Sequence, residues 1–132
     1  MKLVKLLATL LLVLVVCTAS TLEDKKKGMY IVGVSASFTD SLIYFTDVQF
    51  VDSVSLGKDK LLPCRSQYSE QLEDYLKIQQ GLKNRTCFIY YSKKKSSLEK
   101  TVKKMKEKYK NDGKSIVRET GSDFKFTKAI EY

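Results

Sequence analysis

A short apolar run at residues 86–91 constrains the fold of this chain more than any other feature. The run is rich in aromatic and β-branched residues, and it lies between polar segments, Asn84-Arg85 before it and residues 92–95 after it. Such a run predicts a buried strand, and we expect it to be the central strand around which the rest of the chain packs. Helical patterns flank it on both sides, so each helix must pack its apolar stripe onto the sheet that contains this strand.

The two helical patterns are well defined. Residues 66–80 predict the first helix, with Ser66 as its N-cap and Gly81 as the residue that ends it. Residues 96–112 predict the second helix, which begins with a capping box. The predicted apolar stripes are Tyr68, Leu72, Tyr75 and Leu76 in the first helix and Leu98, Val102, Met105 and Tyr109 in the second.

Patterns with a period of two residues predict the remaining strands. Residues 29–37 and 42–49 alternate around a polar turn, which predicts an antiparallel hairpin, and the pattern continues over residues 51–54. Residues 115–120 predict another strand. Residues 124–130 either add one more strand or cover an edge of the sheet.

The resulting order, β-β-α-β-α-β, predicts an α+β fold. We expect a two-layer sandwich in which one mixed sheet carries both helices on a single face. The helical crossovers should be right-handed, and they make the strands at 86–91 and 115–120 parallel to their neighbours where a crossover joins adjacent strands. The sequence leaves the order of strands open, and a split, ferredoxin-like order is one alternative.

The first 20 residues have the pattern of a secretory signal peptide. Lys2 and Lys5 precede an uncharged apolar run, and small residues follow it. A transmembrane anchor is the alternative, but the uncharged run barely reaches the roughly 17 residues that a span needs. We therefore expect an exported chain with a flexible tether over residues 21–28 and a single domain over residues 29–132.

Cys17 adds a further alternative at this end of the chain. A cysteine that ends an apolar run can be the lipidated first residue of a bacterial lipoprotein, although Val16 stands where such signals carry a small residue. Cleavage by a signal peptidase would instead follow Ala19 or Ser20. The expected location is periplasmic or secreted, with a membrane anchor only if Cys17 is lipidated.

Basic charge is concentrated in one part of the chain. The whole sequence has 24 Lys and Arg against 15 Asp and Glu, and residues 93–114 alone contribute ten lysines against three acidic residues. The second helix is therefore the candidate site for an anionic partner such as anionic lipid, acidic polysaccharide or nucleic acid. The alternative is a solvated face in which lysine supports helix formation and solubility. The candidate residues are Lys100, Lys103, Lys104, Lys106, Lys108 and Lys110.

The sequence lacks the side chains that most enzymes and metal sites use. There is no histidine, which excludes His-activated nucleophiles, a His general base and His-containing metal sites. Cys64 and Cys87 form no C-x-x-C motif, and two cysteines cannot complete a four-cysteine zinc site. We therefore predict no enzyme, no cofactor, no metal site and no small-molecule substrate.

Cys64 and Cys87 are also candidates for a disulfide, since export leads to an oxidising compartment where such a loop closure contributes about 3 kcal/mol. The expected geometry opposes it. A strand that returns beneath the first helix needs about six or seven residues to come level with Cys64, and Cys87 lies near the strand's start. A buried, inert Cys87 is the alternative that this geometry favours.

Six short motifs, at residues 37–41, 44–49, 52–53, 68–69, 85–87 and 123–126, together resemble a set of small exported proteins of Bacteroidetes that have no assigned activity. The resemblance spans most of residues 29–128 and implies a location in the cell envelope or outside the cell. It carries over no catalytic or binding residue. Under it, Ser41 and Ser53 look like the Asp-Ser-aliphatic sites that Bacteroidetes glycosylate on exported proteins.

Two hypotheses for function follow. In the first, a non-catalytic exported domain binds an unidentified macromolecule through the sheet face that the helices leave open, at Leu42, Tyr44 and Val48. In the second, the lysine-rich helix over residues 96–112 binds an anionic partner.

Overall fold

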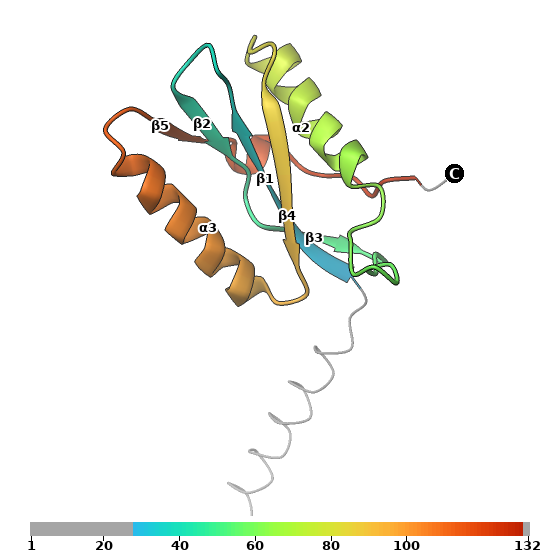
Figure 1. Ribbon diagram of the computed structural model, residues 1–132. Helices are drawn as coiled ribbons and strands as arrows, with labels where there is room; N and C mark the ends of the chain where they lie inside the picture. Colours follow the sequence, from blue (N-terminus) through green and yellow to red (C-terminus); the bar gives the residue numbers. More distant parts are fainter. Residues whose placement is uncertain (1–27, 131–132) are drawn as a thin grey trace, which may run out of the picture.

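The computed structural model describes residues 28–130, so the predicted signal peptide, most of the tether and Cys17 lie outside the described residues. The described part is an α+β domain whose helices and strands follow the predicted order (Figure 1). The elements are β1 (Gly28–Ala36), β2 (Leu42–Phe45), β3 (Gln49–Asp52), α2 (Arg65–Gln79), β4 (Thr86–Ser92), α3 (Lys95–Lys110), β5 (Ile116–Glu119) and a short 3-10 helix, η1 (Gly121–Asp123).

Strand β1 is the centre of the sheet. It pairs antiparallel with β4 along one edge, and its other edge is shared by β3 and β2, which pair with its first and last residues respectively. Strand β5 extends the sheet as a parallel neighbour of β2. The prediction that residues 86–91 form the central strand is therefore wrong: β4 is an edge strand, and its Ile89 is buried because helices cover both of its faces.

Strands β2 and β3 are two parts of one bent strand. Val34 of β1 lies opposite Phe45, and Ile31 lies opposite Gln49. The three residues 46–48 therefore lie opposite only two residues of β1, 32 and 33. This is a β-bulge, which bends the strand and turns later side chains to the other face. It is the reason that the predicted hairpin strand over residues 42–49 is interrupted.

Thr46 ties the bulge to β1. Its backbone N–H donates to the carbonyl oxygen of Gly33 at 2.9 Å, and its side-chain oxygen accepts from the N–H of Gly33 at 2.9 Å. A Cβ atom on Gly33 would lie 2.7 Å from Cδ2 of Leu72, so glycine is what allows α2 to approach the sheet this closely.

The helices cover opposite faces of the sheet (Figure 1). The expectation of two layers with both helices on one face is therefore wrong, and the domain has three layers. The two crossovers run in opposite directions: β3–α2–β4 passes over β1 towards one edge, and β4–α3–β5 returns to the other edge. Right-handed crossovers in opposite directions place their helices on opposite faces.

Each face has its own hydrophobic cluster, and the predicted helical stripes supply both. Tyr68, Leu72 and Leu76 of α2 are buried against Met29 and Ile31. Leu98 and Val102 of α3 are buried on the opposite face, with Met105 and Tyr109 partly buried beside them. Neither serine predicted as an N-cap acts as one, because α2 follows Cys64 and α3 follows Lys94, each without a side-chain cap.

The segment after η1, residues 124–130, forms no strand, and it packs on the α2 face through Phe124, Phe126 and Ala129. Three glutamine side chains hold it. Each donates from its amide nitrogen to a carbonyl of the segment and accepts at its amide oxygen from an N–H of the segment. The pairs are Gln49 with Phe124 and Phe126 (3.0 and 2.7 Å), Gln71 with Thr127 (2.9 and 2.9 Å) and Gln67 with Ile130 (2.9 and 3.1 Å).

Candidate functional site

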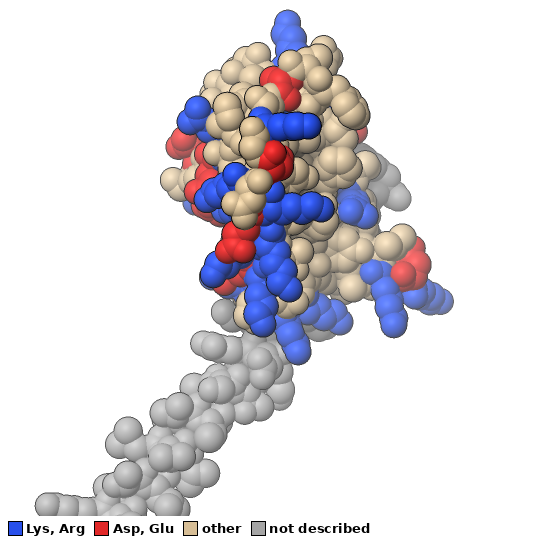
Figure 2. Space-filling model, turned by 60° about the vertical axis from the view of Figure 1, so that its left-hand side comes forward, with Lys and Arg blue, Asp and Glu red and all other residues tan. Residues whose placement is uncertain are grey.

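The exposed side of α3 is where the predicted anion-binding lysines lie, and the structure divides them into three groups. Leu98 and Val102 fix the rotation of the helix because they are buried against the sheet. Basic side chains gather over the face of the molecule seen in Figure 2, with fewer acidic side chains between them. The charge excess that the sequence predicts for this segment is therefore on the surface.

Lys100, Lys104 and Lys108 form the first group, which we call the outward row. They are exposed and follow one another at intervals of four residues, or about 6 Å along the helix axis. Of the three ion pairs among the described residues, none includes a lysine of this row. The row therefore presents positive charge to solvent, and no carboxylate within residues 28–130 pairs with it.

Lys103 and Lys110 belong to a second group, which lines a groove of about 500 Å³ between α3 and the bulge at residues 46–48. Four lysines and three carboxylates line this groove, so its charge is nearly balanced. The charged lining residues are Lys95, Lys103, Lys106, Lys110, Asp47, Glu99 and Glu107.

Lys106 forms the third group alone, because the fold already uses its charge. Its ammonium donates to the carboxylate of Glu119, the last residue of β5, and lies 5.4 Å from the centre of the Phe45 ring. The same contact lowers the pKa of Glu119. Lys106 thus fastens α3 to the sheet, and it is the least suitable of the six predicted lysines for binding a partner.

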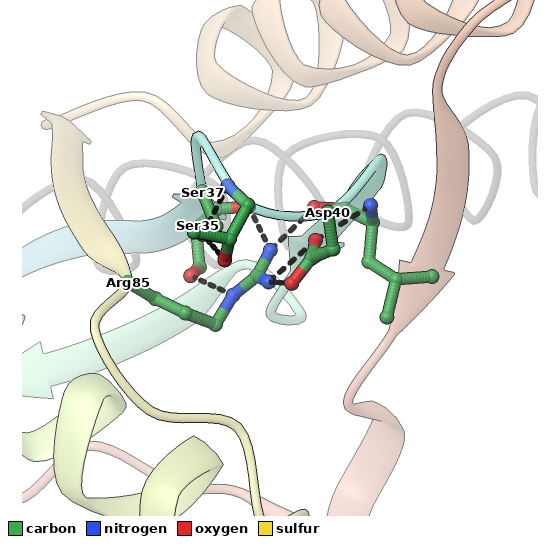
Figure 3. A network of polar contacts seen from close by, with 6 residues as sticks. Ser35, Ser37, Asp40 and Arg85 are labelled. Carbon is green, nitrogen blue, oxygen red and sulfur yellow. Dashed lines mark hydrogen bonds and ion pairs between the residues drawn. The ribbon is translucent and has the colours of Figure 1, made fainter.

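An ion pair with one buried partner, which the sequence does not predict, lies at the β1–β2 turn (Figure 3). The side chain of Arg85 is fully buried, and its Nη1 donates to both carboxylate oxygens of Asp40 at 2.8 and 2.7 Å. Its Nε donates to Oγ of Ser35 at 2.9 Å, and its Nη2 donates to the carbonyl of Leu42. The guanidinium therefore joins the start of β4 to both sides of the turn.

The contacts of Asp40 exclude it as a general base. Its carboxylate also accepts from the N–H of Leu42 at 2.9 Å. The hydrogen bonds from Arg85 are the main cause that lowers the pKa of Asp40, so the carboxylate stays ionised and occupied. Asp40 lies in the predicted polar turn, and no local pattern links it to Arg85, which is far along the chain.

The turn held by Arg85 carries an unusually exposed aromatic side chain. Phe38 is 102% exposed relative to its reference state, so the ring makes no packing contact with the domain. The residues beside it are ordered by a hydrogen bond of 3.2 Å from the N–H of Thr39 to Oγ of Ser37. Ser41, a predicted glycosylation site, is exposed at the end of the same turn.

The two cysteines are free thiols and are partly buried. Cys64 precedes α2 in a left-handed conformation, with φ of 57°. Cys87 lies on β4 and packs against the α2-face cluster, where burial raises the pKa of its thiol. Ser53, the other predicted glycosylation site, is exposed after β3.

The predicted contact surface at Leu42, Tyr44 and Val48 is wrong. Tyr44 packs on the α2 face, where Arg85 lies 5.6 Å from its ring centre, whereas Val48 packs on the α3 face. The bulge at residues 46–48 separates them, and a helix covers each face. These side chains therefore form no common exposed surface.

No group of three or more Cys, Asp or Glu side chains within residues 28–130 is arranged to hold a metal ion. In the same range, no helix combines the length and apolar character needed to cross a bilayer. Comparisons with protein-family models, curated proteins and solved structures find no match to this chain. The similarity to exported Bacteroidetes proteins therefore stays a prediction.

Proposed function

We propose that this chain is an exported, non-catalytic binding module that attaches to a polyanionic macromolecule through the outward row of α3. The observation that carries the proposal is that Lys100, Lys104 and Lys108 are exposed, evenly spaced and unpaired within the described residues. A regular line of cations attracts a regular line of anions and releases the counterions of both.

The chemistry of the described residues supports a binding role in preference to catalysis. The carboxylate of Asp40 is engaged with the buried Arg85, and burial disfavours the thiolate of Cys87. Neither group has the free, activated form that a general base or a nucleophile needs. Export is supported by the pattern of residues 1–20, which places the partner outside the cytoplasm.

Retention on immobilised heparin, measured as the salt concentration at elution, tests the proposal. The variant K100Q/K104Q/K108Q removes three charges from the outward row. Its control, K58Q/K77Q/K125Q, removes three exposed and unpaired lysines elsewhere. We expect the row variant to elute at roughly half the salt concentration of the wild type, with the control in between and close to the wild type.

Two results would contradict the proposal. If the wild-type protein is not retained at about 100 mM salt, the row binds no polyanion of this density. If both triple variants lose retention equally, net charge alone explains the binding and the row has no special part in it.

A further inference from the structure

Strand β4 has one edge that pairs with no other strand in the described chain. The N–H and C=O groups of Gly33 in β1 both bond to Thr46, which lies on the side of β1 away from β4. Neither group therefore points towards Ile89, the β4 residue opposite Gly33. Hydrogen-bonding direction alternates along a strand. The N–H and C=O groups of Cys87, Ile89 and Tyr91 therefore point away from the sheet.

Arg65 occupies one of these outward positions. Its Nη2 donates to the carbonyl oxygen of Ile89 at 2.7 Å, and its guanidinium lies 5.8 Å from the centre of the Tyr91 ring. This is the place at which the N–H of an added strand would donate. The side chain of Arg65 therefore supplies a hydrogen-bond donor to the carbonyl of Ile89, in the middle of an edge that no strand pairs with among the described residues.

Hollows lie on both sides of this edge. One, of about 290 Å³, lies between β4 and the start of α3, and the other, of about 270 Å³, lies between β4 and the start of α2. Arg65 lines both, and Phe88, on the strand between them, is 46% exposed. Side chains of an added strand alternate between the two faces of the sheet, so they would enter the two hollows in turn.

We propose that the outer edge of β4 binds an extended peptide with acidic side chains as an additional strand. The backbone of the peptide pairs with Cys87, Ile89 and Tyr91, and Arg65 moves from the carbonyl of Ile89 to a carboxylate of the peptide. The positive charge at residues 93–95, which follow directly after β4, adds to the attraction for an acidic segment.

Charge also decides between this occupant and a second copy of the chain. If two β4 edges paired about a two-fold axis at Ile89, the guanidinium groups of Arg65 from both copies would meet at the axis. Like charges at that distance oppose pairing. An acidic peptide instead supplies the missing counter-charge.

Amide hydrogen exchange followed by NMR tests the proposal in the domain as exported. The probe is an eight-residue peptide of alternating valine and glutamate, and its two controls replace glutamate by lysine or carry N-methyl groups on alternate amides. We expect the glutamate peptide to slow exchange at Cys87, Ile89 and Tyr91 by about tenfold or more at millimolar concentration. Neither control peptide should do so.

Two variants separate this edge from the outward row of α3. R65Q should weaken binding of the glutamate peptide about five- to tenfold, whereas K104Q, with the same change in charge, should leave it unchanged. The edge of β4 and the outward row of α3 share no residue. If the protein does not bind heparin, the expected effects of the peptide and of R65Q at β4 are therefore unchanged.

Three results would overturn the proposal. The first is unchanged exchange at the three β4 amides with the glutamate peptide, and the second is equal protection by the N-methylated peptide. The third is protection of the same amides without peptide that grows with protein concentration, because a second copy would then occupy the edge.

Discussion

On one face of the sheet, helix α2 and the segment 124–130 together complete a cluster of twelve buried residues, whereas helix α3 alone covers the other face, where six are buried. The aromatic packing differs in the same direction. The α2 face contains Phe124 and Phe126 in contact with each other and with tyrosines of α2, whereas on the α3 face only Phe45 with Tyr109 joins the helix to the sheet, and Tyr30 pairs with the partly exposed Phe50.

This difference separates a face that stabilises the domain from a face that presents charge. Helix α2 is covered from the side by a second layer of chain, and its stripe of Tyr68, Leu72 and Leu76 is fully buried. Helix α3 has lysines around most of its circumference and relies on a narrow apolar stripe and on the contact of Lys106 with Glu119. The predictions below test this contrast, beginning with the largest effect.

The same truncation on the two helices should have unequal costs. We expect L72A to lower the free energy of unfolding by about 4 kcal/mol, because Leu72 is fully buried between Gly33 and the aromatic residues of the tail, where little can relax. L98A should cost about 2 to 3 kcal/mol, since the α3 face is more open. Urea denaturation measures both, and equal costs would remove the distinction between the faces.

Removing the counter-charge of Arg85 should have the next largest effect. D40N leaves a fully buried guanidinium without its anion, and we expect a loss of about 3 kcal/mol in urea denaturation. The single variant R85K should also be less stable than the wild type, although it keeps the charge. A lysine cannot make the paired contacts to Asp40 and Ser35. A variant D40N as stable as the wild type would show that this pair is dispensable.

The pH dependence of the same pair has a definite sign. The pKa of Asp40 in the folded domain lies below its ordinary value of 3.8, so its contribution is fully present above pH 4. The contribution is lost as the pH falls through the lowered pKa, because the proton then binds the unfolded chain more strongly. Below about pH 4, the stability of D40N should therefore fall less steeply with decreasing pH than that of the wild type in acid unfolding experiments.

The glutamine contacts to the tail should contribute less. Q71A removes both hydrogen bonds to Thr127, which are exposed, and we expect a loss of about 1 kcal/mol. Q71E keeps the acceptor and loses the donor, so its stability should fall between the wild type and Q71A. Urea denaturation measures this loss. In Q71A we also expect faster proteolysis within residues 124–130, because the hydrogen bonds that hold this segment on α2 are missing.

The smallest effect is expected on the α3 face. K106Q removes the ion pair with Glu119, which is largely exposed, and the loss should be below about 1 kcal/mol and should shrink as salt is added. A loss as large as that of D40N would mean that charge, and not the apolar stripe, holds α3 on the sheet.

The sequence predicts the elements of this fold better than their arrangement. Helices and strands follow from local periodicity, so their order and the stripes through Leu72 and Val102 are confirmed. Which face each helix covers depends on the order of strands, and pairing between distant strands leaves no local pattern. The central position of β1 and the bulge near Thr46 were missed for the same reason.

The candidate sites divide in the same way. The lysine row of α3 can be recognised in the sequence because its residues lie within one short segment at helical spacing. The pair of Arg85 and Asp40 joins residues 45 positions apart, and the open edge of β4 exists only once β1 is known to be central. An arginine directly before a strand and an aspartate in a turn were the only local signals for the buried pair.

The exposed ring of Phe38 has a consequence for the thermodynamics of any contact it makes. Arg85 restrains the chain on both sides of the turn, at Ser35 and at Asp40, so the loss of backbone freedom there occurs when the domain folds. If a partner surface binds the ring of Phe38, the turn that carries the ring is already ordered. Binding then requires no further loss of backbone entropy in this turn.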